Sequence, residues 1–117
     1  MCRKSAERLP AMLRVQVLVF DILRSLAPIV RQISHHDPSL ADQIRRAGAS
    51  VALNLAEGRG SQGRNGKARF HNALGSLREV QAALEVAKAF EYVTGIDADL
   101  AQRIDCALAM VFGLIRA

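Results

Sequence analysis

The stretch DQIRRAGASVALNLAEGRG, residues 42–60, decides the fold. Together with Leu40 just before it, the stretch carries apolar residues at a spacing of three or four, which places them on one face of an α-helix. The members of this core stripe are Leu40, Ile44, Ala47, Val51 and Leu55. Such a stripe is typical of a helix that packs against other helices, because its apolar face must be buried.

A second stripe, made of polar residues, runs directly beside the core stripe. Helical periodicity places its members within about 80° of one another, and they are Gln43, Arg46, Ser50, Asn54 and Glu57. An unpaired polar group in a protein interior costs roughly 1 to 3 kcal/mol, so we expect these groups to be paired. Asp42 lies four residues before Arg46, a spacing that favours an ion pair. Ser76 and Glu79, on a later helix, are expected to meet the stripe across a helix interface.

This polar network has two main interpretations. The first is a structural set of hydrogen bonds that fixes how neighbouring helices align. The second is a groove for a ligand or a nucleic acid. Catalysis is the weakest interpretation, because no Cys/His pair, Ser/His/Asp set or metal cluster is readable and the two glutamates have no evident reactive companion. We expect no cofactor.

The rest of the circumference of this helix consists mostly of small residues. Its members are Arg45, Gly48, Ala49, Ala52, Leu53 and Ala56. A helix exposed to water on this side would carry Lys and Glu instead. We therefore expect the helix to be covered on more than one side, with the alanine-rich flank facing a neighbour.

The same helical spacing recurs along the whole chain of 117 residues. It predicts helices over about residues 9–34, 39–58, 65–92 and 97–116, and no strand. Asp37 or Ser39 is a candidate cap for the second helix, and Gly58 a candidate stop. The core lacks Trp and must come from Leu, Ile, Val and Ala, which favours helices. We predict a single all-α domain, an antiparallel up-down-up-down four-helix bundle.

Composition and charge limit the classes of protein. Sixteen basic against 11 acidic residues give a net charge of +5, which permits an anionic partner such as nucleic acid. Charged residues interrupt the first apolar run, so we expect neither a signal sequence nor a membrane span. Cys2 and Cys106 form no metal or redox spacing. Reduced cysteines and a cytoplasmic location are the simplest expectation.

The segment EGRGSQGRNGKARF, residues 57–70, contains a literal GxGxxG. That fingerprint binds dinucleotides only between a strand and a helix, and no strand precedes it here. We interpret the segment as a flexible loop, and a solvated loop needs no further function. Its basic residues are nevertheless the best candidates for contact with phosphate. They are Arg59, Arg64, Lys67 and Arg69, with Arg3, Lys4 and Arg8 near the N-terminus as further candidates.

Two smaller features are a pair of histidines and a second apolar patch. His35 and His36 are adjacent in a connecting segment without a third ligand at helical spacing, so we predict no metal site. The third predicted helix has a second apolar patch on its back, which includes Val86 and Phe90. A second apolar face on a bundle helix is typical of a partner surface.

The segments DQIRRAGASVALNLAEG and RFHNALGSLREVQAAL resemble the 23S rRNA intervening-sequence protein family, small bacterial four-helix bundles first noticed within large-subunit ribosomal RNA genes. The residues that match the family pattern are Asp42, Gln43, Arg45, Arg46, Ala47, Ser50, Asn54, Ala56, Glu57, Gly58, Phe70, Leu74, Gly75, Ser76 and Glu79. They cover about half the chain. The first predicted helix departs from the usual family start, so nothing functional is carried over there.

The resemblance implies a four-helix protomer that assembles as a ring, with a homopentamer favoured. It also implies similarity to the accessory proteins of diversity-generating retroelements, which bind nucleic acid and a reverse transcriptase through a basic pentameric surface. It implies no enzymatic activity. In this light Ser50, Asn54 and Glu57 are best interpreted as structural contacts between the second and third helices.

Two functional hypotheses follow. The first is a non-enzymatic, cytoplasmic, oligomeric bundle that binds RNA or DNA through its basic residues. The second is a structural adaptor whose apolar helix face, with Val86 and Phe90, docks a protein partner. No membrane partner is expected.

Overall fold

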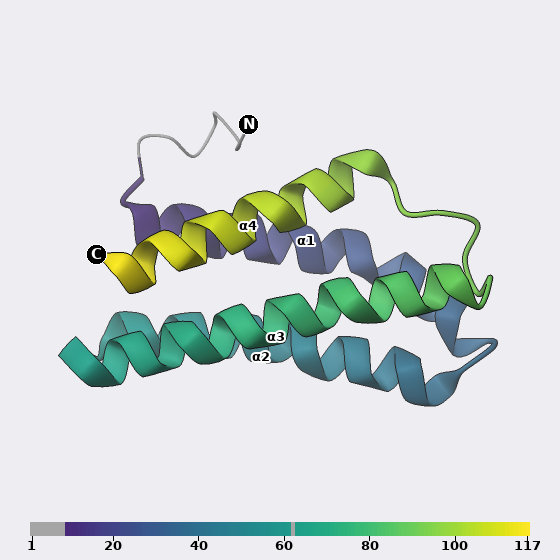
Figure 1. The fold of residues 1–117 in the computed structure, drawn as a ribbon, viewed down its shortest axis with the longest axis horizontal. Helices are drawn as coiled ribbons and strands as arrows, with labels where there is room; N and C mark the ends of the chain where they lie inside the picture. Colours follow the sequence, from purple (N-terminus) through teal and green to yellow (C-terminus); the bar gives the residue numbers. More distant parts are fainter. Residues whose placement is uncertain (1–8, 62) are drawn as a thin grey trace.

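The structure, a computed structural model, describes residues 9–61 and 63–117. It contains four helices, α1 (Ala11–Ser34), α2 (Pro38–Gly60), α3 (Gly63–Ala89) and α4 (Ala98–Arg116), and no strand within these residues. Successive helices run in opposite directions along the long axis (Figure 1). Neighbouring pairs in contact are α1 with α2, α2 with α3, α3 with α4, and α4 with α1. The predicted all-α four-helix bundle is confirmed.

The core lies between the four helices and is aliphatic. All five residues of the predicted core stripe of α2 are buried, as are Leu74, Leu77, Val80, Leu84 and Ala87 of α3. In α1, Phe20 and Ala27 are exposed, whereas the equally apolar Val15 and Ile33 are buried. Apolar character alone does not reveal which side of a helix has a neighbour.

The connection between α1 and α2 follows the predicted chemistry. The Asp37 carboxylate accepts a hydrogen bond from the Leu40 amide at 3.0 Å, and Pro38 occupies the first turn, where its missing N–H costs nothing. The phenol of Tyr92 lies 3.5 Å from the other Asp37 oxygen. Its ring stacks on His36 with centroids 5.3 Å apart. One aspartate thus caps α2 and contacts the chain after α3.

The glycine-rich segment is a tight helical corner, and the prediction of a flexible loop is wrong. α2 continues past Gly58 to Gly60, and α3 begins at Gly63. Gly58 is buried against the ring of Phe70, which a Cβ at position 58 would overlap. A Cβ at Gly66 would lie 3.1 Å from the Ser61 carbonyl oxygen. These glycines therefore permit close approach of backbone and side chains, and Gly58 does not stop the helix.

α3 ends earlier than predicted, at a residue with positive φ. Glu91 has a φ of 62°, and its amide donates to the Lys88 carbonyl at 3.0 Å. The Tyr92 amide donates to the Ala87 carbonyl at 2.9 Å. These two bonds form a Schellman motif, which usually places Gly at the left-handed position. Because a glutamate occupies this position, the usual glycine signal for the end of a helix is absent from the sequence.

Candidate functional site

Four basic side chains gather at one end of the bundle. Arg59 is in the last turn of α2, and Arg64, Lys67 and Arg69 are in the first two turns of α3. All four are exposed. The α2–α3 corner lies at the same end as the start of α1 and the end of α4, where Arg116 sits (Figure 1). We call Arg59, Arg64, Lys67 and Arg69 the basic end.

Two of these four cations have partners within the described residues. Arg69 pairs with Glu57 at 3.1 Å, and Arg59 donates to the Gln16 side chain at 3.3 Å. Arg64 and Lys67 make no hydrogen bond or ion pair with any described residue. Glu57 is the sole acidic residue in the sequence between 55 and 70. The basic end therefore keeps an excess of positive charge.

The opposite end of the bundle is acidic. It consists of the segments 37–42 and 91–99, which flank the α1–α2 and α3–α4 connections (Figure 1). These segments contain Asp37, Asp42, Glu91, Asp97 and Asp99, and neither contains Lys or Arg. Asp42 and Asp99 are paired with Arg46 and Arg103, so the acidic charge of this end is partly neutralised, whereas the basic end keeps unpaired cations that attract an anionic partner.

The three residues Ser50, Asn54 and Ser76 form the central part of the predicted polar network. The hydroxyls of Ser50 and Ser76 lie 2.8 Å apart and join α2 to α3. The Asn54 amide donates to the Ser50 hydroxyl at 3.0 Å and to the Ser50 carbonyl at 2.9 Å. All three side chains are half-buried. Their geometry is that of a structural contact between two helices.

The other predicted members lie outside this contact. Asp42 and Arg46 form the expected ion pair at 2.9 Å, but their side chains are 52% and 81% exposed. Glu57 on α2 pairs with Arg69 on α3 and so makes the expected contact between these helices, although its side chain is 59% exposed. Gln43 and Glu79 are exposed, with no polar partner among the described residues. The stripe of α2 therefore divides into a contact with α3 and a solvent-facing part.

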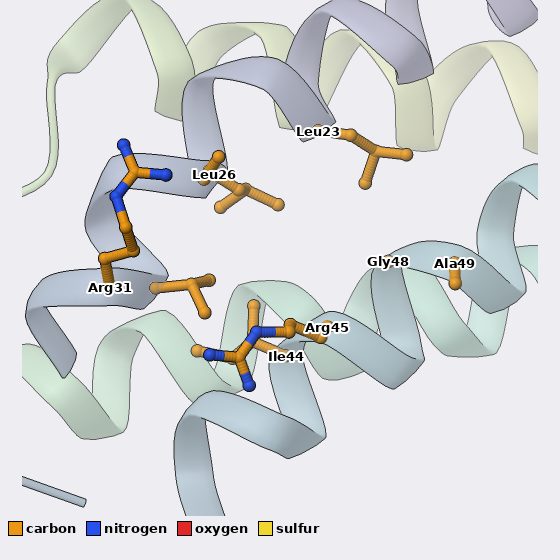
Figure 2. Close-up of a pocket in the computed structure, with 9 residues that line it drawn as sticks. Leu23, Leu26, Arg31, Ile44, Arg45, Gly48 and Ala49 are labelled. Atoms are coloured by element: carbon orange, nitrogen blue, oxygen red, sulfur yellow. The ribbon is translucent and has the colours of Figure 1, made fainter. Parts of the chain in front are cut away.

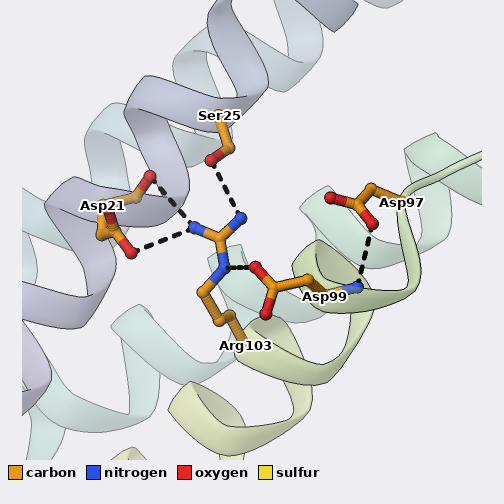
Figure 3. Close-up of polar contacts among 5 residues, drawn as sticks. All are labelled: Asp21, Ser25, Asp97, Asp99 and Arg103. Carbon is orange, nitrogen blue, oxygen red and sulfur yellow. Dashed lines mark hydrogen bonds and ion pairs between the residues drawn. The ribbon is translucent and has the colours of Figure 1, made fainter. Parts of the chain in front are cut away.

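A second polar cluster, which the sequence analysis missed, joins α1 to α4 (Figure 3). Arg103 is buried at 9% exposure. It donates to the Asp21 carboxylate at 3.1 Å, the Ser25 hydroxyl at 2.9 Å and the Asp99 carboxylate at 2.9 Å. An arginine between the core positions Leu100 and Ala107, four residues after an aspartate, is the signal that points to this cluster.

Three further expectations concern cysteines, metals and membranes. Cys106 on α4 is disulfide-bonded, so the expectation of reduced cysteines is wrong and the cysteines no longer favour a reducing compartment. Among the described residues, no three His, Cys, Asp or Glu side chains group as metal ligands. Within residues 9–61 and 63–117, none of the helices combines the length and hydropathy needed to cross a bilayer. Arg3, Lys4 and Arg8 lie outside the described residues.

Comparison with known proteins gives a family and a fold. Among curated proteins, none matches this chain. A crystal structure of a protein with unknown function from the S23 ribosomal protein family, from Bacteroides thetaiotaomicron VPI-5482, is similar with a TM-score of 0.74 and 17% identity. The match covers 88% of this chain and 99% of that one. At this identity the similarity concerns the fold.

The family model described as 23S rRNA-intervening sequence protein matches residues 13–113. The match includes α2, α3 and the corner between them, where the motifs seen in the sequence lie. The chain belongs to the 23S rRNA-intervening sequence protein family.

Proposed function

We propose that the protein is a non-enzymatic, oligomeric bundle that binds RNA or DNA through its basic end. The observation that carries the proposal is the placement of Arg59, Arg64, Lys67 and Arg69 around one helical corner, opposite an acidic end. Lysine and arginine at this density neutralise phosphates and release counterions, which drives binding to nucleic acids.

The start of α3 adds to this attraction. Its first turn contains no acidic residue, so no carboxylate of that turn offsets the partial positive charge of the helix N-terminus. Arg64 and Lys67 project from the first two turns without a partner among the described residues. Both features favour a phosphate over a neutral ligand.

Binding can be tested with a fluorescently labelled 20-nucleotide RNA and a duplex DNA of the same sequence, by anisotropy at rising salt. The variant Arg64→Gln/Lys67→Gln removes two cations whose side chains make no hydrogen bond or ion pair with a described residue. We expect its plot of log affinity against log salt to be shallower by about 1.5 to 2 than that of the wild type.

The matched control is Arg24→Gln/Arg46→Gln, which removes two exposed charges away from the basic end. It should retain the wild-type slope. Absence of binding by the wild-type protein at low salt would exclude this function. An equal decrease of the salt slope in the control variant would show that the net charge of the protein, and not the basic end, accounts for binding.

The proposed self-association rests on exposed apolar side chains. Phe20, Leu53, Phe90 and Phe112 are each at least 47% exposed. Large apolar groups at this exposure favour burial against another protein. A homopentamer is the state that the family resemblance favours, and light scattering measures it.

The second candidate function is an adaptor that docks a protein partner, such as a reverse transcriptase. It is favoured by Val86 and Phe90 on α3, which are 41% and 66% exposed. An adaptor would recover its protein partner in a pull-down after nuclease treatment, whereas a nucleic-acid-binding protein would recover nucleic acid.

A further inference from the structure

A groove of about 320 Å³ runs between α1 and α2. Its apolar lining includes Leu23, Leu26, Val30, Ile44 and Ala49 (Figure 2). Gly48 also lines it, and a Cβ there would come within 2.8 Å of Leu23. The groove is therefore apolar and lies where the two helices approach closely.

Two arginines flank this groove. Arg31 comes from α1 and Arg45 from α2, and both lie at the same end of the apolar lining (Figure 2). Both are exposed, and neither guanidinium group makes a hydrogen bond or ion pair with a described residue. Two unpaired guanidinium groups beside an apolar surface fit an occupant that has apolar side chains and a carboxylate.

The outer face of α3 has this chemistry. Glu79 and Val86 are on α3, and Phe90 directly follows its last residue, with its amide donating to the Val86 carbonyl at 3.0 Å. Their spacing of seven and four residues places them on one side of the helix. All three are exposed, and Glu79 has no polar partner among the described residues. α3 does not line the groove of its own chain. The two surfaces can therefore meet only between two copies.

The spacing along the helices agrees with such a contact. With a rise of about 1.5 Å per residue, Val86 lies about 10 Å from Glu79, and Phe90 about 16 Å. On α2, Ala49 lies about 6 Å and Leu53 about 12 Å beyond Arg45. If the partner's α3 runs parallel to α2, a Glu79 carboxylate at the arginines thus sets Val86 beside Leu53, which is 64% exposed, and Phe90 about one turn beyond it.

We propose that the α1–α2 groove binds the outer face of α3 from a second copy of this chain, with Glu79 placed between Arg31 and Arg45. This inference rests on the proposed self-association and assigns its two surfaces. The surfaces differ, so the contact is head-to-tail and repeats from copy to copy until a ring closes.

Charge reversal tests the contact, with light scattering on nuclease-treated protein as the readout and circular dichroism as the check on folding. We expect Arg45→Glu and Glu79→Arg each to weaken association at least tenfold, because each places like charges together. The double variant Arg45→Glu/Glu79→Arg should regain assembly. In an equimolar mixture of the two single variants, each variant should associate with the other and not with itself, so the mixture should form assemblies with an even number of copies.

Arg64→Glu is the control, because it makes the same change of charge at the basic end. It should assemble as the wild type does and lose affinity for nucleic acid. If the wild type assembles and Arg45→Glu assembles equally well, the assignment of the groove is wrong while self-association stands. If the wild type is a monomer at 100 μM, which is about 100 times a Kd of 1 μM, both the groove assignment and the proposed self-association are wrong.

Discussion

The two halves of the bundle are joined by different means. α2 and α3 meet through small residues, with glycines at their corner and the hydroxyls of Ser50 and Ser76 at 2.8 Å. α1 and α4 meet through one long side chain, Arg103, which reaches Asp21 and Ser25 on α1. A contact between small residues requires the two helices to approach closely. An arginine can bridge helices that are further apart, but it is stable only when all of its hydrogen-bond partners are present. The halves should therefore respond differently to substitution.

The largest effect is expected at the α2–α3 corner. Gly58→Ala places a methyl group against the ring of Phe70, which is packed from the other helix. Overpacking of this kind costs about 1 to 3 kcal/mol of unfolding free energy. Urea denaturation at fixed protein concentration measures the loss.

Gly60→Ala is the matched control for that substitution. No atom lies within 4 Å of a Cβ at position 60. Its unfolding free energy should match the wild type or rise slightly, since alanine restricts the unfolded chain. Equal losses at positions 58 and 60 would refute the role of close packing at the corner.

A smaller loss is expected at the α1–α4 contact. Arg103→Met keeps most of the apolar stem and removes four charge-assisted hydrogen bonds. Asp21 is 30% exposed and regains some water, so we expect a loss of about 1 to 2 kcal/mol. Arg24→Met, at an exposed position on α1, should change stability by less than about 0.5 kcal/mol. A wild-type melting curve for Arg103→Met would contradict the bridging role.

The smallest effect concerns the hydroxyl pair of α2 and α3. Ser50→Ala and Ser76→Ala should each cost roughly 0.5 to 1.5 kcal/mol, because each leaves a half-buried hydroxyl with fewer partners. The double variant should cost less than the sum of the two. A double-mutant cycle measures this coupling, and strict additivity would show that the two serines do not act together.

Structural features that depend on the spacing of residues within a few helical turns can be predicted from the sequence. The core stripe of α2, the Asp37 cap and the Asp42–Arg46 pair all involve residues within one or a few turns, and all are present in the structure. The Ser50–Ser76 contact was also expected, because two polar stripes on consecutive helices tend to meet.

The sequence does not predict what depends on a distant partner. Arg103 and Asp21 are 82 residues apart, and only the packing of α1 on α4 brings them together. The role of Gly58 depends on where the ring of Phe70 lies, so glycine rules suggested a helix stop and a loop instead. That difference matters for function, because an ordered corner holds the basic side chains of the basic end on two helix ends.

The central claim is that this corner contacts nucleic acid and that the acidic end does not. The most direct test is a titration of isotopically labelled protein with a short single-stranded RNA at low salt, followed by backbone amide NMR. We expect the largest chemical-shift changes at residues 59–70 and unchanged chemical shifts at residues 91–99. Changes centred on residues 91–99, or none at any residue, would contradict it.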